Sequence, residues 1–166
     1  TRYNFQHSYA KASNANAFLL DIMKEKGIEN PLKEFLLAWQ GKHPTPHDFF
    51  YFMNNLCGED LGWFWKAWYF DFSAPDQELK RLDDTQQVQV INKGGIPLPI
   101  RLNVRYADEH ETVIEKSIWA WSGNKEAILV DIPEYEKVKS IQLGWPAIPD
   151  IDRSNNTLEY KNHLSD

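Results

Sequence analysis

The stretch from Lys42 to Asp71 most constrains the fold of this chain, because it reads as two short helices almost residue by residue. Thr45 is a good N-cap, Pro46 suits the first helical position, and Asp48 stands where a capping box places an acid. Gly58 suits a left-handed C-cap that ends the first helix. Apolar side chains recur at helical spacing: Phe49, Phe52, Met53 and Leu56 in the first helix, and Leu61, Phe64, Trp65 and Trp68 after Asp60 in the second.

This aromatic surface must be covered by other parts of the chain. We expect Trp63, Phe64, Trp65 and Trp68 to be mostly buried. Trp63 lies off their stripe, so these side chains cannot all face one core. We therefore expect these four residues to be buried partly beneath the second half of the chain.

Two further amphipathic helices precede this stretch. The first covers about residues 10–26 and is followed by Gly27, and the second begins after the cap residue Asn30 and stops at Gly41. Their apolar faces carry Ala15, Phe18, Leu19, Ile22 and Met23 in the first, and Leu32, Phe35, Leu36 and Trp39 in the second. Four such helices with short links predict a compact array in which the apolar stripes bury one another.

The period of the apolar residues changes near Ser73. Residues 73–76 break the helical pattern, residues 79–84 are charged, and an alternating pattern follows. It predicts strands at 88–90, 96–106, 112–121, 128–132 and 138–143. Pro97 and Pro99 indicate an edge or a bulge where the longest strand begins. Short strands at this spacing are typical of a small antiparallel β-sandwich.

The predicted fold class is therefore α+β in two parts. Residues 1–72 form a helical array, residues 73–85 a linker, and residues 86–166 the β-sandwich. The net charge of −6 argues against a nucleic-acid partner, because phosphate binding needs a basic face. No apolar run approaches the roughly 20 residues that span a bilayer, and we expect no signal peptide within these 166 residues. The single cysteine, Cys57, excludes an internal disulfide, and we expect it to be a small buried side chain.

The first half resembles the late helical part of the M1 family of zinc aminopeptidases, which are gluzincin metallopeptidases, in the form common in bacteria. The matching pattern is W-x-x-K-H-P-x-P-x-D-F, a short helix, and then G-x-D-L-x-W-F-W-x-x-W. It falls on Trp39, Lys42, His43, Pro44, Pro46, Asp48, Phe49, Gly58, Asp60, Leu61, Trp63, Phe64, Trp65 and Trp68. Weaker motifs continue into the second half, at Asn92, Gly94, Pro99, Leu102, Val104, Pro149, Asp150, Asp152, Arg153, Asn155 and Asn156.

The resemblance implies a parent enzyme that removes N-terminal residues from peptides with a zinc-activated water. It makes residues 1–72 the end of a thermolysin-like catalytic domain, with the sandwich as the domain after it. The partners implied are the upstream catalytic domain of the parent and its peptide substrate. The chain begins at Thr1 without a methionine, so we expect a fragment or a processed product. Similar bacterial proteins suggest a periplasmic or secreted location, which the sequence itself does not indicate.

The zinc ligands of that family, H-E-x-x-H and a downstream glutamate, are not found in this sequence. His43 and His47 have the right separation, but Pro44 replaces the essential glutamate. His110 and Glu111 begin like the motif, but residue 114 is an isoleucine. We expect these histidines to serve in capping, turns or the surface. The chain alone should bind no cofactor and be inactive, serving as scaffold and as a wall of the substrate pocket.

Tyr9 is the one candidate catalytic residue. The family carries a tyrosine in a Y-x-K-G sequence whose phenol donates to the oxyanion of the tetrahedral intermediate. Here the match is Tyr9-Ala10-Lys11-Ala12, with alanine in place of the glycine. The resemblance thus implies an oxyanion-stabilising role for Tyr9 in the parent. The alternative is a tyrosine that only packs at the start of a helix.

Other candidate sites have simpler alternatives. No nucleophile constellation is evident. Asp150 and Asp152 could bind calcium, but a solvated turn is the simpler interpretation. Trp119 and Trp121 would share one face of a strand and could form a ligand platform, or could be buried against the helical part of the chain. The alternative function is accordingly a non-catalytic module that binds protein or carbohydrate.

Overall fold

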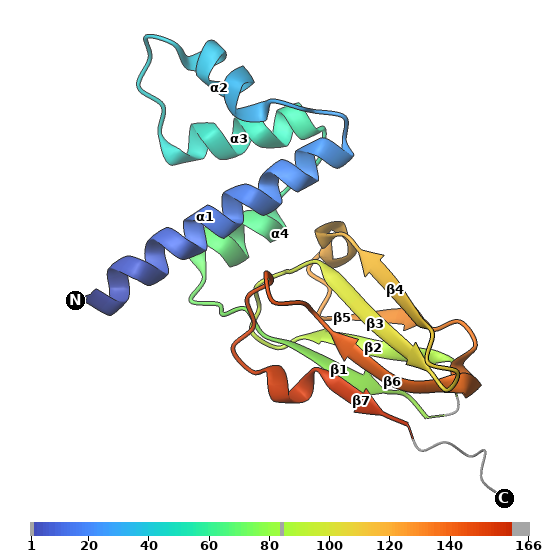
Figure 1. The fold of residues 1–166 in the computed structure, drawn as a ribbon. Coiled ribbons are helices and arrows are strands. Elements are labelled where there is room, and N and C mark those ends of the chain that lie inside the picture. Colours follow the sequence, from blue (N-terminus) through green and yellow to red (C-terminus); the bar gives the residue numbers. More distant parts are fainter. Residues whose placement is uncertain (1, 84, 161–166) are drawn as a thin grey trace, which may run out of the picture. The chain divides into compact units, whose positions relative to one another are not determined.

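The computed structural model describes the backbone of residues 2–83 and 85–160, and side chains from residue 11 onward within these ranges (Figure 1). The chain divides into two compact units, one up to Asp71 and the other from Phe72. The first unit is helical, and the second holds two antiparallel sheets. This confirms the predicted α+β class with a small β-sandwich. Among the described residues, no helix is both long and apolar enough to cross a membrane.

The helical unit contains four α-helices and a final π-helical turn within its described residues. They are α1 (Arg2–Glu25), α2 (Pro31–Trp39), α3 (Pro46–Cys57), α4 (Gly62–Trp65) and η1 (Lys66–Phe70). The first helix begins at Arg2, well before the predicted start near residue 10. The prediction was wrong because the first residues are polar and aromatic without a helical period.

The capping chemistry of α3 is as predicted. The backbone N–H of Asp48 donates to Oγ1 of Thr45 across 3.3 Å, and the N–H of Thr45 donates to Oδ2 of Asp48 across 2.8 Å. Gly58 ends the helix in the left-handed conformation, with φ of 73°. The cap predicted at Asn30 is different, because its side chain makes no capping hydrogen bond. The start of α2 is instead favoured by Pro31 at the first helical position, because its fixed φ suits a helix.

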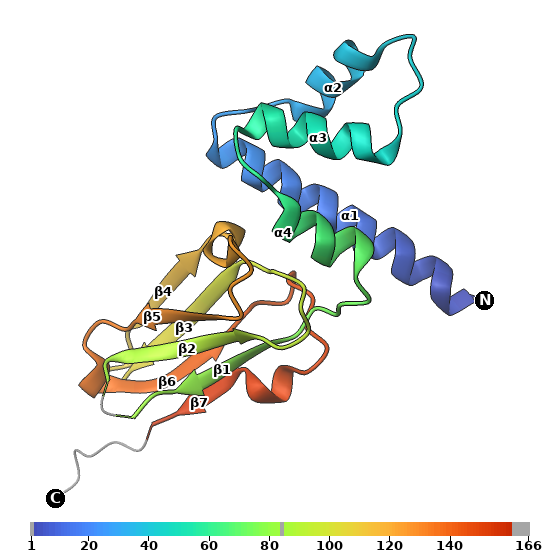
Figure 2. The ribbon, with the colours of Figure 1, turned by 180° about the vertical axis from the view of Figure 1, so that it is seen from behind.

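The core of the helical unit forms where α1 lies alongside α4 and η1 (Figures 1 and 2). The rings of Phe18 and Trp68 lie 5.4 Å apart. The buried side chains include Ala15, Leu19, Ile22, Met23, Phe50, Met53, Cys57, Leu61, Phe64 and Trp65. Each large apolar side chain buried in this way contributes about 1.5–3 kcal/mol. The predicted burial of Phe64, Trp65 and Trp68 is confirmed, but the prediction was wrong for Trp63, which is only half-buried because it lies off their stripe.

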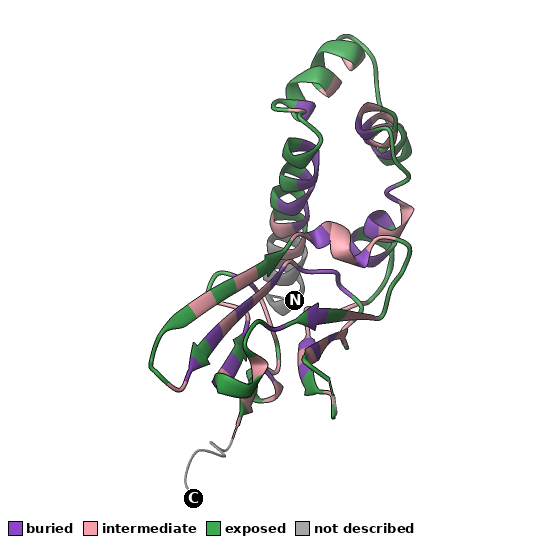
Figure 3. Ribbon diagram, turned by 90° about the vertical axis from the view of Figure 1, so that its right-hand side faces the viewer, coloured by how far each residue is buried: buried purple, intermediate pink, exposed green. Residues whose placement is uncertain are grey.

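The β-sandwich consists of a three-stranded sheet in the order β1-β2-β5 and a four-stranded sheet in the order β4-β3-β6-β7 (Figures 1 and 2). The strands are β1 (Gln77–Arg81), β2 (Gln87–Asn92), β3 (Ile100–Tyr106), β4 (Glu111–Lys116), β5 (Ala127–Asp131), β6 (Val138–Leu143) and β7 (Thr157–Glu159). Buried positions alternate with less buried ones along β2 and β3, whereas β4 and β7 carry no buried residue; Figure 3 shows the burial along the ribbon. The buried positions of β3 are the alternating apolar residues of the sequence, Ile100, Leu102, Val104 and Tyr106.

Three predictions in this half need correction. The predicted linker of residues 73–85 contains β1, which pairs with β2 along its whole length. It was missed because an edge strand needs few apolar residues, and only Leu79 is apolar in it. The strand predicted at 96–106 begins at Ile100, since Pro97 and Pro99 cannot donate to a sheet. The strand predicted at 112–121 ends at Lys116, and residues 118–121 form a 3₁₀ helix.

Candidate functional site

Tyr9, the candidate catalytic residue, lies within α1, and its side chain is outside the described residues. Its role in the parent therefore stays a prediction. Lys11, two positions further on, is described. Its ammonium donates to the backbone carbonyl of Asp71 across 2.9 Å, and partial burial lowers the pKa of this lysine. Lys11 thus ties α1 to the residue that follows η1.

The structure describes the side chains of three histidines, His43, His47 and His110. His43 is exposed before α3, and His47 lies in the first turn of α3, where its ring contacts Phe50 and Phe70. Among residues 11–83 and 85–160, no group of three or more His, Cys, Asp or Glu side chains could hold a metal ion.

His110 and Glu111 also have structural surroundings. The ring of His110 stacks on Tyr106 with centroids 4.1 Å apart, and its Nδ1 contacts the Asp108 carboxylate. Glu111 accepts a hydrogen bond from Nε of Arg105 across 3.0 Å. These contacts hold the turn between β3 and β4.

The carboxylates proposed as calcium ligands support turns of the backbone. Asp150 accepts from Nδ2 of Asn156 across 2.8 Å and from the N–H of Asp152 across 3.0 Å. Asp152 caps the 3₁₀ helix Arg153–Asn155 through the N–H of Ser154. This arrangement favours the interpretation of a turn over a calcium site.

The proposed tryptophan platform is wrong in its geometry, because Trp119 and Trp121 lie on a 3₁₀ helix instead of one face of a strand. Trp121 is 1% exposed. Its Nε1 donates to the carbonyl oxygen of Leu98 across 2.6 Å, so this indole belongs to the core of the sandwich. A ligand cannot stack on it.

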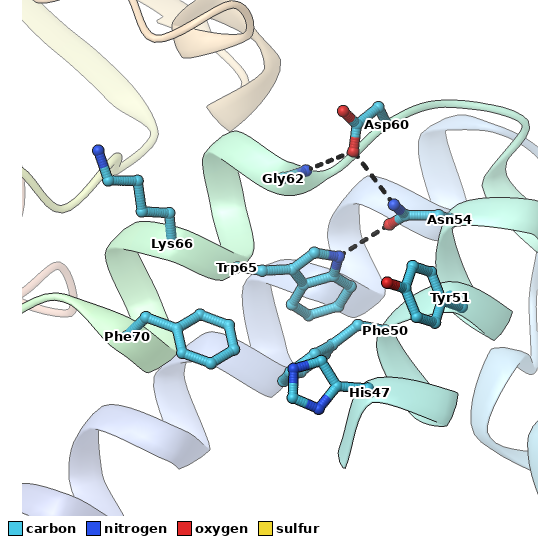
Figure 4. Close-up of a pocket in the computed structure, with 9 residues that line it drawn as sticks. All are labelled: His47, Phe50, Tyr51, Asn54, Asp60, Gly62, Trp65, Lys66 and Phe70. Carbon is cyan, nitrogen blue, oxygen red and sulfur yellow. Dashed lines mark hydrogen bonds between the residues drawn. The ribbon is translucent and has the colours of Figure 1, made fainter. Parts of the chain in front are cut away.

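A different site emerges in the helical unit, as a hollow of about 250 Å³ (Figure 4). We call it the aromatic hollow. Its rings come from α3, α4 and η1, and they are His47, Phe50, Tyr51, Trp65 and Phe70. Phe50 and Trp65 are buried, with ring centroids 4.6 Å apart. Tyr51 and Phe70 are 66% and 56% exposed, so they present their rings to solvent.

A chain of hydrogen bonds fixes the polar side of the aromatic hollow (Figure 4). Nε1 of Trp65 donates to Oδ1 of Asn54 across 2.8 Å, and Nδ2 of Asn54 donates to Oδ1 of Asp60 across 3.2 Å. The same Asp60 oxygen accepts from the N–H of Gly62 across 2.9 Å, at the start of α4. The carboxylate of Asp60 is thus linked to the indole through the amide of Asn54, while remaining exposed.

Sequence reasoning did not find this hollow, although α3 carried a signal for it. His47, Tyr51 and Asn54 recur at i, i+4 and i+7, so they share one face of the helix beside the buried stripe. The contribution of Phe70 to the hollow is seen only in the tertiary structure. This residue ends a π-helical turn, so its position does not follow from regular α-helical spacing.

No protein-family model and no curated protein matches this chain. Among solved structures, the crystal structure of Legionella pneumophila aminopeptidase A in complex with aspartic acid has a similar part. The match is 21% identical, covers 70% of this chain with a TM-score of 0.44, and spans 14% of the Legionella chain.

Proposed function

We propose that this chain is the C-terminal portion of an M1-like zinc aminopeptidase, an enzyme that hydrolyses N-terminal residues from peptides. The observation that carries the proposal is the family's motif, which runs in register from Trp39 to Trp68. A match of this length, with fixed spacing and several tryptophans, is unusual for unrelated proteins.

The local structure of the motif residues supports this proposal. Asp48 closes the capping box of α3, Gly58 supplies its left-handed end, and Asp60 binds the first N–H of α4. These residue types are required by the connection between two helices at this spacing. The motif residues therefore shape the connection between α3 and α4. They have a structural role and no catalytic one.

The motif of the second half supports the proposal in the same way. Asn92 accepts a hydrogen bond from the N–H of Gly95 across 2.9 Å. A Cβ at Gly94 would lie 2.0 Å from the carbonyl oxygen of Ala74, so only glycine fits there. Both features explain why an N-x-G sequence stands at this turn.

In the proposed parent, the zinc ligands come from the part of the catalytic domain upstream of this chain. The chain itself supplies scaffold, a wall of the substrate pocket and the phenol of Tyr9, and we expect it to be inactive alone. The phenol would donate to the oxyanion that forms during hydrolysis.

The gene that encodes the parent tests this proposal. We expect an H-E-x-x-H sequence and a downstream glutamate before Thr1, and we expect the expressed parent to release amino acids from aminoacyl reporters. The 166-residue chain, assayed as the control, should release none. A parent without the histidine–glutamate motif, or with it but without peptidase activity, would contradict the proposal.

A further inference from the structure

We infer, on the basis of the proposed function, that the exposed apolar side of α2 is covered by the part of the parent that precedes Thr1. This side of the helix consists of Leu32, Leu36 and Leu37, which are 41%, 67% and 60% exposed. We call these three side chains the leucine face. They are the surface through which the helical unit would join the rest of its catalytic domain.

The apolar stripe of α2 is only partly buried by the described part of the chain. The sequence places Leu32 and Leu36 on the same side of this helix as Phe35. The ring of Phe35 packs edge-on against Phe49 and Phe52 of α3, with centroids 5.0 Å and 5.4 Å apart. The two leucines of the same stripe are exposed instead. An amphipathic helix of a folded domain normally turns its whole apolar stripe toward a core, so this one is suited to a further covering element.

Exposed apolar side chains are concentrated in the helical unit. Among the described residues, eleven large apolar side chains are exposed, and seven of them belong to the unit that ends at Asp71. Yet fewer side chains are described in this unit than in the other one. The β-sandwich thus covers most of its own apolar surface, whereas the helical unit leaves much of its own in contact with solvent. Such a surface is typical of a unit that packs against another part of a protein.

The size of the leucine face favours cover by the same chain over cover by a separate molecule. Each of its side chains presents less than the ~150–250 Å² of an aromatic side chain. Three partly exposed leucines therefore do not reach the ~800 Å² per partner that a stable interface between separate proteins buries. A segment of the same chain needs no such area, because the covalent connection already holds it at a high effective concentration. The area thus favours the upstream segment over a second copy of the chain.

The test is hydroxyl-radical footprinting, read by mass spectrometry, which measures how far solvent reaches each leucine side chain. It compares the 166-residue chain with the full-length parent. We expect the oxidation of Leu36 and Leu37 to be several-fold slower in the parent. Leucines that react equally in both proteins, or a gene with no segment before Thr1, would overturn the inference.

The footprint does not depend on activity, so it separates this inference from the proposed function. Reactive leucines in a parent that is an active peptidase would contradict the inference alone. Protected leucines in a parent without peptidase activity would contradict the proposed function alone.

A second copy of the chain is the alternative occupant, and sedimentation equilibrium of the 166-residue chain tests it. We expect a monomer, because the leucine face is too small for a stable dimer. A dimer that Leu36→Gln dissociates would assign the leucine face to a second copy and would overturn the inference.

Matched variants test whether the cover contributes to stability. Leu36→Gln should lower the melting temperature of the parent by a few degrees and leave that of the 166-residue chain unchanged, because the side chain is covered only in the parent. The control is Ile151→Gln, at a 68% exposed side chain of the β-sandwich, and it should change neither. No shift in the parent with Leu36→Gln, an equal shift in both proteins, or an equal shift with the control would overturn the inference.

Discussion

Nε1 of Trp65 donates a hydrogen bond to Oδ1 of Asn54 across 2.8 Å, and this bond joins α4 to α3. The same oxygen accepts from the N–H of Leu61 across 3.3 Å, so one amide serves both the helix start and the buried indole. Trp65 is only 4% exposed, and water would not readily replace a lost partner.

Asn54→Ala should therefore destabilise the helical unit. It leaves the indole N–H of Trp65 without its acceptor, which costs about 1–3 kcal/mol for a buried group. Denaturant unfolding followed by far-ultraviolet circular dichroism measures this change. Asn55→Ala is the matched control, because the next residue of α3 is exposed. Equal effects of the two substitutions would show that the hydrogen bonds of Asn54 are not important for stability.

The capping box of α3 predicts a dependence of stability on pH. Hydrogen bonds from the backbone N–H and the hydroxyl of Thr45 lower the pKa of Asp48. A lowered folded-state pKa stabilises the protein above the pKa of the unfolded state, and this contribution is lost as the pH falls through the folded-state value.

The stability difference between the wild type and Asp48→Ala should thus be largest at neutral pH and should shrink in strong acid. Chemical denaturation at several pH values measures this difference, and an NMR titration of the Asp48 carboxyl carbon gives its pKa. A pKa equal to that of a free aspartate, or a stability difference independent of pH, would contradict the role of the cap.

Gly94→Ala should disrupt the β-sandwich, because the added Cβ would meet the carbonyl oxygen of Ala74 at 2.0 Å. The matched control is Gly123→Ala, where nothing lies within 4 Å and only the positive φ of 75° opposes a side chain. The control should cost about 1 kcal/mol, and Gly94→Ala should cost more. Thermal unfolding of both variants gives the comparison, and the reverse order would show that Ala74 moves aside freely.

Tyr9→Phe is a prediction for the full-length parent that we propose. A phenol that donates only in the transition state lowers the barrier with little effect on substrate binding. Its loss should reduce kcat by about a hundred- to a thousandfold, or about 2.7–4 kcal/mol. KM and the melting temperature should change little, because the ring remains. A normal kcat would leave Tyr9 a packing residue, and a parallel fall in kcat and melting temperature would make its hydroxyl structural.

Features decided by neighbouring residues were predictable from the sequence. The cap at Thr45, the end of α3 at Gly58 and the alternation along β3 all depend on local chemistry or on one period. The strand β1 was not predictable, because its partner in β2 stabilises it more than its own composition does. The 3₁₀ helix of residues 118–121 was missed because its cap residue, Ser117, lies within a pattern that resembles a strand.

The aromatic hollow was only half predictable. The face of α3 that carries Tyr51 and Asn54 follows from helical spacing, and the burial of Trp65 follows from its stripe. The position of Phe70 does not follow from the sequence, since it depends on the π-helical turn that ends at this residue. Sites assembled from several elements depend on tertiary packing, which a single sequence shows only indirectly.

The zinc content of the full-length parent, measured beside that of the 166-residue chain, tests the central claim most directly. If this chain is the C-terminal portion of an M1-like aminopeptidase, the purified parent should hold one zinc ion per chain after extensive dialysis. The 166-residue chain, treated in the same way, should hold no stoichiometric zinc. One tightly held zinc ion on the shorter chain, or none on the parent, would contradict the account.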